Sequence, residues 1–589
     1  MWYQTHFSPT QRYKDTLAHK ELRLVRSLLG RVWQRIRVEA PPGNPYPDWA
    51  QLLDDNRALW NAALSRASNG PHVLIATSAG GFVPGAIVES TLAVALTLRG
   101  AQVHVLLCDE LLPACIQGMM YTTDADEYAQ FGPQHSLCGV CFAPGYDTYR
   151  PLGLQIHRYS ELVTDDELAE AASISAKIDY SEIGDYQLDG LAVGEHALAG
   201  TLRFFARGDL KGEPKAEEIL RRYLKASLLT SFATRRLLRK FPFTSACFHH
   251  GIYVPQGLIG EVARKGGVRV VNWNPAYRKQ CFIFSHHDTY HHTLLEEPVS
   301  NWQSIEWNAK MESEIMDYLK SRWQGTRDWI WFHEKPQEEP SSIAAELGLD
   351  FSRPCVGLLT NVIWDAQLHY RANAFPDMLQ WVLQTIRYFS DRPEIQLLIR
   401  VHPAEIRGTL PSRQPIVAEI NRAFFELPKN IFVIPPESRV STYATMAQCN
   451  AVLIYGTKTG VELTSMGIPT VVAGEAWIRN KGMTMDARSS DEYFQILDQL
   501  PLEGRLNPEQ IERARKYAYH FFFRRMIPLS FMYPSNDRTP YQLQLQSIKQ
   551  LSAGREPGLD IICEGILNGI EFIYRAEMSQ HKNLASLPA

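Results

Sequence analysis

The sequence predicts an α/β protein built from two doubly wound, Rossmann-like domains. With 589 residues, the chain is longer than one hydrophobic core usually serves. Short apolar runs alternate with helical stretches, which is typical of βαβ units and parallel sheets. This alternation occurs twice, in residues 71–335 and 354–500. We expect a helical arm over residues 1–70 and a helical tail over residues 501–589.

The composition places the chain among soluble globular proteins, with 45% hydrophobic and 21% charged residues. A net charge of -4 gives no reason to expect a nucleic acid as partner. The N-terminus lacks a basic segment followed by an apolar one, and no run approaches the roughly 20 apolar residues of a spanning helix. We therefore expect a cytoplasmic protein without a transmembrane segment, whose association with the inner face of a membrane would be peripheral.

The first domain opens as a doubly wound fold does. A buried strand over residues 72–77 meets a turn of small residues, followed by a helix over 86–99 and a strand over 103–108. The glycines of the turn do not fit the dinucleotide pattern G-x-G-x-x-G. In a two-domain enzyme this turn would face an acceptor. The acceptor-side candidates are Ser78, Gly80 and Gly81.

Four of the nine cysteines cluster in the sequence, and the last two form a Cys-x-x-Cys. They are Cys108, Cys115, Cys138 and Cys141. Four thiolates within so short a stretch can close a tetrahedral structural zinc site. In the alternative interpretation, Cys108 ends a buried strand and the other three fill loop space.

Polar clusters follow the later strands of the first domain, at 249–251, 272–274 and 285–292. Carboxyl ends of parallel strands are where an open α/β sheet builds its site. The last cluster holds four histidines and one aspartate between His286 and His292, so it could bind a metal or supply a general base, with His287 as candidate. Alternatively, it is a solvated loop whose histidines form caps.

The second domain carries polar residues after three of its predicted strands. Asp365 follows the strand 355–360, in a loop that precedes a helix. The strand 396–401 ends in Arg400-Val401-His402-Pro403. The strand 451–455 continues into Gly456-Thr457-Lys458-Thr459-Gly460-Val461-Glu462, followed by a helix, Gly-x-Pro and another strand. Strand, glycine-hydroxyl turn and helix form a unit that places backbone N–H groups where anions bind.

These residues suit a sugar-nucleotide donor. Arg400 offers a planar fork to phosphate oxygens, and His402 offers a proton donor to the phosphate or to the leaving oxygen. Thr457 and Thr459 offer hydroxyls. Gly456 and Gly460 allow the backbone to approach the phosphate closely.

Two residues of this turn have a structural alternative. Glu462 either accepts both ribose hydroxyls or completes a capping box with Thr459, and the two roles are compatible. Lys458 is either a phosphate contact or a surface residue, and the surface role is favoured. Asp365 joins the donor-binding candidates.

Two like-built α/β domains around a cleft, with a tail that recrosses, describe the GT-B glycosyltransferase fold. The HP motif at residues 400–403, followed by residues 456–462 and Gly467-Ile468-Pro469, resembles bacterial capsule polysaccharide biosynthesis glycosyltransferases. These include Kdo transferases and, more distantly, bacterial sialyltransferases with an HP motif. The resemblance covers mainly residues 354–500.

The resemblance implies a CMP-sugar or related donor held by the second domain, with His402 at its phosphate. It also implies an inverting, metal-independent transfer that requires no cofactor for the chemistry and uses a carboxylate of the first domain as base. No acidic motif stands out there. The candidates for the base are Glu89, Asp109 and the histidines near 286–292.

The leading hypothesis is a glycosyltransferase that moves a sugar from a nucleotide-sugar to a surface polysaccharide or glycolipid. One alternative is a sugar-nucleotide epimerase or hydrolase of the same architecture. Another is a non-catalytic nucleotide-sugar-binding assembly protein. A polyglycerophosphate-type transferase with a CDP-linked donor is a further neighbour among the enzymes.

Overall fold

A computed structural model describes residues 44–324, 327–329, 336–366, 368, 372–408, 410–535 and 539–579. Most of the predicted N-terminal arm therefore lies outside the described residues. Its last part forms α2 (Trp49–Asp54) and α3 (Arg57–Ala67), which bury Trp49 and Trp60 in the core of the first domain. None of the helices in the described ranges is long and apolar enough to cross a membrane.

The first sheet has the strand order β13-β6-β5-β4-β1-β2-β3. Its strands are β1 (His72–Ser78), β2 (Gln102–Leu107), β3 (Gln155–Arg158), β4 (Phe243–His249), β5 (Arg269–Pro275), β6 (Cys281–His286) and β13 (Ile527–Pro528). The five from β3 to β5 are parallel, and β6 and β13 are antiparallel additions. The chain turns back between β1 and β4, which makes this pair the switch point where doubly wound sheets bind ligands.

The second sheet is wholly parallel, in the order β12-β11-β10-β7-β8-β9. Its strands are β7 (Cys355–Leu359), β8 (Gln396–Arg400), β9 (Ile431–Ile434), β10 (Ala451–Ile454), β11 (Thr470–Val472) and β12 (Met485–Asp486). Its switch point lies between β7 and β10. The predicted α/β class with two doubly wound sheets is therefore confirmed.

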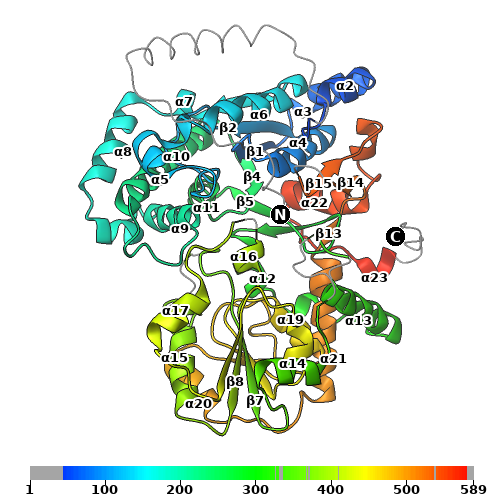
Figure 1. The fold of residues 1–589 in the computed structure, drawn as a ribbon. Coiled ribbons are helices and arrows are strands. Elements are labelled where there is room, and N and C mark those ends of the chain that lie inside the picture. Colours follow the sequence, from blue (N-terminus) through cyan, green and yellow to red (C-terminus); the bar gives the residue numbers. More distant parts are fainter. Residues whose placement is uncertain are drawn as a thin grey trace.

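Helices cover both faces of each sheet (Figure 1). In the first domain they are α4 (Val83–Leu98), α5 (Ala125–Phe131), α6 (Phe142–Tyr149), α7 (Tyr159–Leu162), α8 (Asp165–Lys177), α9 (Val193–Phe205), α10 (Ala216–Lys240), α11 (Gln256–Lys265) and α12 (Tyr290–Leu295). The later helices are α13 (Ala309–Gln324), α14 (Pro340–Leu347), α15 (Met378–Ser390), α16 (Ala404–Arg407), α17 (Ile416–Ala423), α18 (Thr442–Met446), α19 (Thr459–Ser465) and α20 (Ser490–Leu497).

Alternation along the strands builds two cores in each domain. In β1, Val73 and Ile75 enter the core on one face, and Leu74 and Ala76 enter the core on the other. This follows from the period of two in a strand, whose successive side chains point to opposite faces. Because both faces are buried, these strands read as continuous apolar runs in the sequence.

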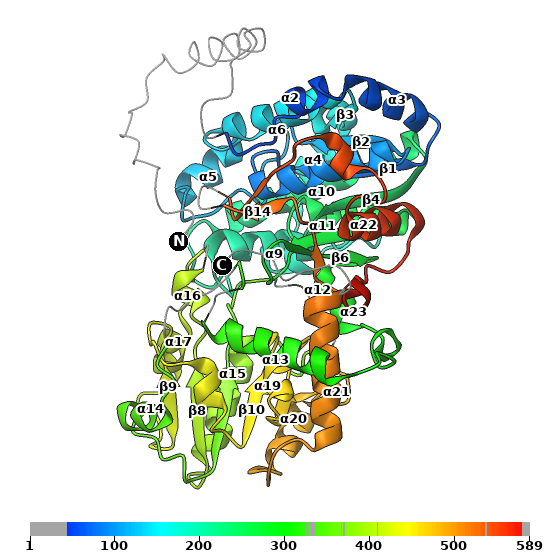
Figure 2. The same cartoon turned by 90° about the vertical axis from the view of Figure 1, so that its right-hand side faces the viewer.

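The C-terminal segment returns to the first domain. Helix α21 (Pro508–Tyr519) and the π-helical turn His520–Arg524 run beside α13 between the domains (Figure 2). Beyond them, β13 joins the first sheet, β14 (Met532–Pro534) pairs with β15 (Tyr541–Leu543), and α22 (Pro557–Asn568) and α23 (Ala576–Ser579) follow. The tail predicted to be helical thus contains three short strands as well.

Candidate functional site

The two switch points meet at one interdomain contact. The loop after β4 carries Tyr253, whose hydroxyl donates a hydrogen bond of 3.0 Å to the Asp365 carboxylate in the loop after β7. The Ala366 N–H donates to the same Tyr253 oxygen at 3.0 Å. The carboxyl ends of the switch-point strands, where doubly wound sheets in general bind their ligands, therefore face one another across this contact.

Asp365 is exposed to solvent, although protein surrounds it closely. Burial raises the pKa of its carboxyl, while the Tyr253 hydroxyl and the Arg203 charge oppose the rise. The Arg203 guanidinium lies 5.3 Å from the centroid of the Tyr253 ring. The contact therefore holds a carboxyl, a phenol and a cation together.

Neutral histidines lie beside this contact. Burial holds the pKa of His250, in the loop after β4, well below its usual value, and it lowers the pKa of His291 to about 3. The His291 ring is 6.3 Å from that of His250 and 5.5 Å from that of Trp477 in the second domain, centroid to centroid. These imidazoles thus offer neutral hydrogen-bonding groups near neutral pH.

His292, the next residue of α12, has a carboxylate near each nitrogen of its ring. Burial disfavours the charged form of His292, but the carboxylates of Asp288 and Glu475 outweigh it and raise its pKa. The His292 Nδ1 is 2.8 Å from the Asp288 carboxylate, and its Nε2 is 4.0 Å from that of Glu475 in the loop after β11. The His292 ring therefore lies between a carboxylate of the first domain, Asp288, and one of the second, Glu475.

His402, directly after β8, has its orientation fixed by the backbone. Its N–H donates to the Thr360 hydroxyl at 3.0 Å, and its Nδ1 accepts the Ala404 N–H at 3.0 Å. Because Nδ1 accepts, a neutral His402 carries its proton on Nε2. Nε2 is the atom that the predicted phosphate contact requires.

The Arg400 guanidinium hydrogen-bonds to the loop after β9. It is 1% exposed, and its guanidinium donates to the carbonyl oxygens of Pro435 at 2.6 Å and Ser438 at 3.1 Å. Both carbonyls belong to the loop after β9. The predicted phosphate contact by Arg400 does not fit this orientation, because its guanidinium is directed at the carbonyl oxygens of this loop.

The turn after β10 presents a different set of groups than predicted. Thr457 accepts the Thr459 N–H at 3.3 Å, and the two hydroxyls lie 3.1 Å apart. A Cβ on Gly460 would lie 2.6 Å from the Ile454 side chain, so this glycine allows close packing of the helix. A Cβ on Gly456 would lie 3.2 Å from the Asn361 amide and 3.8 Å from the Glu475 carbonyl oxygen, so Gly456 has more room beside it than Gly460.

Glu462 belongs to a buried ionic cluster with Lys458, Arg322 and Asp328. Its Oε1 accepts Lys458 Nζ at 2.6 Å and Arg322 Nε at 3.1 Å, and Arg322 also pairs with Asp328. Burial works to raise the pKa of Glu462, but the two cations outweigh it and lower that pKa. Burial and Arg322 lower the pKa of Lys458, yet its short contact with an ionised carboxylate keeps the pair charged.

This cluster corrects two interpretations of the sequence. The N-cap of α19 is Lys458 and forms no side-chain cap bond, so the capping box of Thr459 and Glu462 is wrong. Lys458 has 15% of its side chain exposed, so it is not a surface residue. Arg322 lies 140 residues before Glu462, and no local pattern could identify this partner.

The turn after β1 is covered by protein. Ser78 is 0% exposed, and its hydroxyl shares a hydrogen bond of 3.1 Å with Tyr159. A Cβ on Gly80 would lie 2.8 Å from the Cys141 carbonyl oxygen, and the Gly81 N–H donates to Cys141 Sγ at 3.1 Å. The glycines therefore serve close packing against the segment at Cys141.

Glu89 lies on α4, behind the strand ends of the first domain. It is 1% exposed, and its Oε1 accepts the His249 N–H at 3.0 Å and Trp273 Nε1 at 2.9 Å. Burial raises its pKa to about 7, although hydrogen bonds from Thr77, Trp273 and His249 oppose the rise. Glu89 therefore has a base-like pKa but no route to a substrate in this conformation.

Two further base candidates of the first domain, Asp109 and His287, are also placed elsewhere. Asp109 accepts the Ser160 N–H at 3.1 Å and so caps the segment after β3. His287 is exposed, and its N–H donates to the Val270 carbonyl oxygen near the start of β5. The start of β5 lies opposite the carboxyl ends of the parallel strands. The structure therefore does not bring His287 to the interdomain contact.

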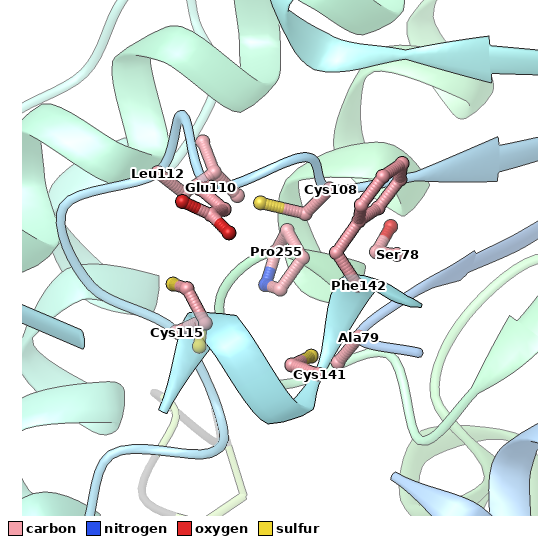
Figure 3. A pocket seen from close by; sticks show the side chains of 10 residues that line it. Ser78, Ala79, Cys108, Glu110, Leu112, Cys115, Cys141, Phe142 and Pro255 are labelled. Atoms are coloured by element: carbon pink, nitrogen blue, oxygen red, sulfur yellow. The ribbon is translucent and has the colours of Figure 1, made fainter. Parts of the chain in front are cut away.

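All four clustered cysteines line one small pocket together with Ser78 and Glu110. Figure 3 shows Cys108, Cys115 and Cys141 around it. Burial raises the pKa of Cys108 and Cys115 to about 12. Among the described residues, no group of three or more His, Cys, Asp or Glu side chains is arranged to hold one metal ion. The cysteines thus gather as the zinc prediction requires, but without the geometry of a single-ion site.

The residues at the interdomain contact were only partly visible in the sequence. The polar clusters at strand ends indicated His250 and His291, whereas Tyr253, Arg203 and Glu475 were missed. Tyr253 lies 112 residues before Asp365, in a stretch without a motif. The sequence feature that could have indicated Tyr253 is its position as a polar residue shortly after a strand at the switch point.

No family model matches the chain. No curated protein matches it either. Solved structures that it resembles include KpsC, a β-Kdo 2,4-transferase of Thermosulfurimonas dismutans, at 11% identity and a TM-score of 0.31 over 46% of this chain and 79% of that chain.

Two further solved structures represent other activities. The chain resembles a UDP-GlcNAc 2-epimerase of Methanocaldococcus jannaschii at 10% identity and a TM-score of 0.26, over 76% of this chain and 98% of that chain. It also resembles a family 9 glycosyl transferase of Veillonella parvula at 10% identity and a TM-score of 0.17, over 76% and 97%. Kdo transferases are thus among the similar structures, but similarities this low carry no argument about the activity of this chain.

Proposed function

We propose that this protein is a glycosyltransferase of the GT-B type that uses a nucleotide-sugar donor. One observation carries the proposal: the switch points of two doubly wound sheets meet at the hydrogen bond between Tyr253 and Asp365. Each switch point is a ligand-binding crevice by itself. Two crevices that open on one contact suit a reaction between two substrates, with the donor on one domain and the acceptor on the other.

The donor side is assigned to the second domain. His402 Nε2 donates to a phosphate oxygen, because its Nδ1 is occupied by the Ala404 N–H. Gly456 leaves space for the phosphate, and Thr457 supplies a hydroxyl at the same strand end. A neutral donor aimed at the leaving phosphate stabilises the negative charge that develops there.

The acceptor side is assigned to the loop after β4, with His250 and Tyr253. Asp365 is the proposed general base, because it is exposed at the domain contact and its pKa is shifted upward, the direction that favours proton transfer near neutral pH. This assignment departs from the expected base in the first domain. The CMP-sugar donor, the inverting outcome and the polysaccharide or glycolipid acceptor remain parts of the proposal that follow from the sequence resemblance.

The donor class is tested by thermal unfolding of the full chain with CMP, CDP, UDP and GDP. A nucleotide that binds the native state raises the melting temperature in proportion to the logarithm of its excess over the dissociation constant. We expect CMP to give the largest shift and His402→Ala to reduce that shift. If no nucleotide stabilises the protein, the proposed donor site is wrong.

Turnover separates the proposal from its alternatives. We expect His402→Ala and Asp365→Asn to lower transfer to an acceptor by about 100-fold or more, as for loss of a charge-stabilising donor or a positioned base. His135→Ala, at an exposed histidine of the first domain, is the matched control and should transfer normally. Conversion of the donor without acceptor would indicate an epimerase or hydrolase, and donor binding without turnover would indicate an assembly protein.

A further inference from the structure

A second contact between the domains joins the end of α9 to residues 412–414, in the loop before α17. The Arg413 N–H donates to the Ala206 carbonyl oxygen at 2.9 Å, and the Arg413 guanidinium pairs with the Glu213 carboxylate at 2.9 Å. Figure 1 shows α9 and α17 on one side of the boundary between the domains, and α13 and α21 on the other. The contact therefore holds the domains together on the side away from the crossing helix α21.

Gln414 makes two complementary hydrogen bonds in this contact. Its Oε1 accepts the Gly208 N–H, and its Nε2 donates to the Asp209 carboxylate, both at 2.9 Å. Gln414 is 3% exposed, so both ends of its amide are satisfied away from water. Losing either partner would leave a buried polar atom unpaired, which is costly. The amide therefore fixes the position of one segment relative to the other.

Helix α9 also holds the loop after β4, which is the proposed acceptor side. His196 Nδ1 lies 2.5 Å from the Ile252 carbonyl oxygen of this loop. The Arg203 guanidinium, in the last turn of α9, lies 5.3 Å from the centroid of the Tyr253 ring. The end of α9 is therefore fixed relative to the acceptor loop.

The other end of the contact is joined to His402 through Glu405 of α16. The Glu405 N–H donates to the His402 carbonyl oxygen at 3.0 Å, and the Glu405 carbonyl oxygen accepts the Ser412 N–H at 2.7 Å. The Glu405 carboxylate accepts the Ile416 N–H at 2.9 Å. A continuous path of contacts thus runs from the acceptor loop through α9 and residues 412–414 to His402.

We propose that Gln414 and Arg413 are positioning residues that set where His402 lies relative to the acceptor loop. This inference rests on the proposed function, in which His402 binds the donor phosphate. The donor and acceptor lie on different domains, so a small displacement of one domain moves the reacting groups apart. A misplacement of about 1 Å can lower a rate by about 100-fold. The hydrogen bonds of Gln414 oppose such a displacement.

Gln414→Glu in the full chain tests the positioning. It keeps an acceptor for the Gly208 N–H but places a second carboxylate against Asp209. We expect transfer to fall about tenfold or more. The rise in melting temperature with CMP should be unchanged, because the donor-binding residues are intact. Gln414→Glu combined with Asp209→Asn exchanges donor and acceptor in this hydrogen bond and should restore most of the transfer.

Two further variants frame this result. Arg413→Ala removes the pair with Glu213 and should lower transfer in the same direction. Arg422→Ala is the matched control, because this exposed side chain pairs with Glu419 of its own helix, and it should transfer normally.

Hydrogen exchange of the ligand-free chain tests the contact without relying on activity. The amides of Gly208 and Arg413 donate across the domain boundary. We expect them to exchange about tenfold faster or more in Gln414→Glu than in the wild type, and to slow again in the double variant.

The outcomes separate the proposal from the proposed function. Faster exchange with lowered transfer, both reversed in the double variant, supports the positioning role. Normal transfer in Gln414→Glu would overturn it, whatever the exchange rates. Loss of CMP stabilisation together with transfer would also overturn it, because the donor site itself would then be damaged. A wild type that transfers no sugar would instead refute the proposed function, and the positioning role would fall with it.

Discussion

Each domain buries one glutamate on the helix that follows a strand of its switch point. The pKa values of the two carboxyls are shifted in opposite directions. Glu89 on α4 is 1% exposed and has only neutral hydrogen-bond donors, and burial raises its pKa to about 7. Glu462 on α19 is 0% exposed and contacts Lys458 and Arg322, which lower its pKa. Burial is equal, so the neighbouring cations decide the charge of each carboxyl.

The difference also explains how each domain holds its strand ends. In the first domain, Glu89 ties the ends of β4 and β5 together by neutral hydrogen bonds through His249 and Trp273. In the second domain, the pair of Glu462 and Arg322 joins α19 to α13, a helix that precedes the strands of the second sheet in the chain. Both glutamates therefore join segments more than 100 residues apart, Glu89 by neutral hydrogen bonds and Glu462 by charge pairing.

The largest expected effect comes from removing the anion of the ionic cluster. Glu462→Gln leaves Arg322 and Lys458 buried with Asp328 as their remaining carboxylate, so we expect a loss of about 3–5 kcal/mol in the free energy of unfolding. Urea unfolding at neutral pH measures it. Glu217→Gln, which breaks an exposed pair with Arg221, is the control and should cost about 1 kcal/mol or less.

A double variant sharpens that result. Glu462→Gln combined with Lys458→Met removes one charge of each sign and leaves Arg322 paired with Asp328. We expect this protein to be more stable than Glu462→Gln alone, because the uncompensated cation is gone. A double variant that is less stable than the single one would show that charge balance does not control this cluster.

Glu89 should make stability depend on pH. Its folded pKa of about 7 lies above the ordinary value of 4.5. The stabilisation of the folded state by neutral Glu89 is therefore complete below pH 4.5 and is lost as the pH rises through about 7. Glu89→Gln keeps an acceptor oxygen but cannot ionise. Relative to this variant, the wild type should lose up to about 3 kcal/mol between pH 4.5 and 8.5. Parallel curves would show that Glu89 has an ordinary pKa.

The two switch-point turns should differ in their tolerance of a methyl group. A Cβ on Gly80 would lie 2.8 Å from backbone atoms at both Cys141 and Gly145, so Gly80→Ala should cost about 1–3 kcal/mol in unfolding free energy. Gly456→Ala meets a side chain at 3.2 Å and should cost about 1 kcal/mol or less. Gly456→Ala should nevertheless weaken nucleotide binding. Equal stability costs would remove the distinction between a covered turn and an open one.

The smallest expected effect per interaction concerns the contact between the domains. Tyr253→Phe removes two hydrogen bonds, to Asp365 and from the Ala366 N–H, and each should contribute about 0.5–1.5 kcal/mol to the free energy of unfolding. A double-mutant cycle with Asp365→Asn isolates the pairwise term. Additive losses would mean that the two side chains are not coupled in solution.

Local patterns predicted most of the sheet and helix elements. The strands predicted over 355–360, 396–401 and 451–455 are present as β7, β8 and β10, each ending within one residue of its expected position. The histidine-rich segment contains regular structure at both ends, because Ser285 and His286 end β6 and its last histidines begin α12. Strand β13 has two residues and exists because the edge of the first sheet offers it partners. Such strands leave no periodic signal.

The sequence by itself determined two parallel sheets, their turns and the positions of polar residues after strands, because side-chain periodicity and turn chemistry act over a few residues. It also identified four cysteines that belong together. Only the tertiary structure decided which polar residues meet: Tyr253 with Asp365, and Glu462 with Arg322. These pairs join segments more than 100 residues apart, as their separations of 112 and 140 show. Their charge states follow from burial and neighbouring charge, which exist only once the chain has folded.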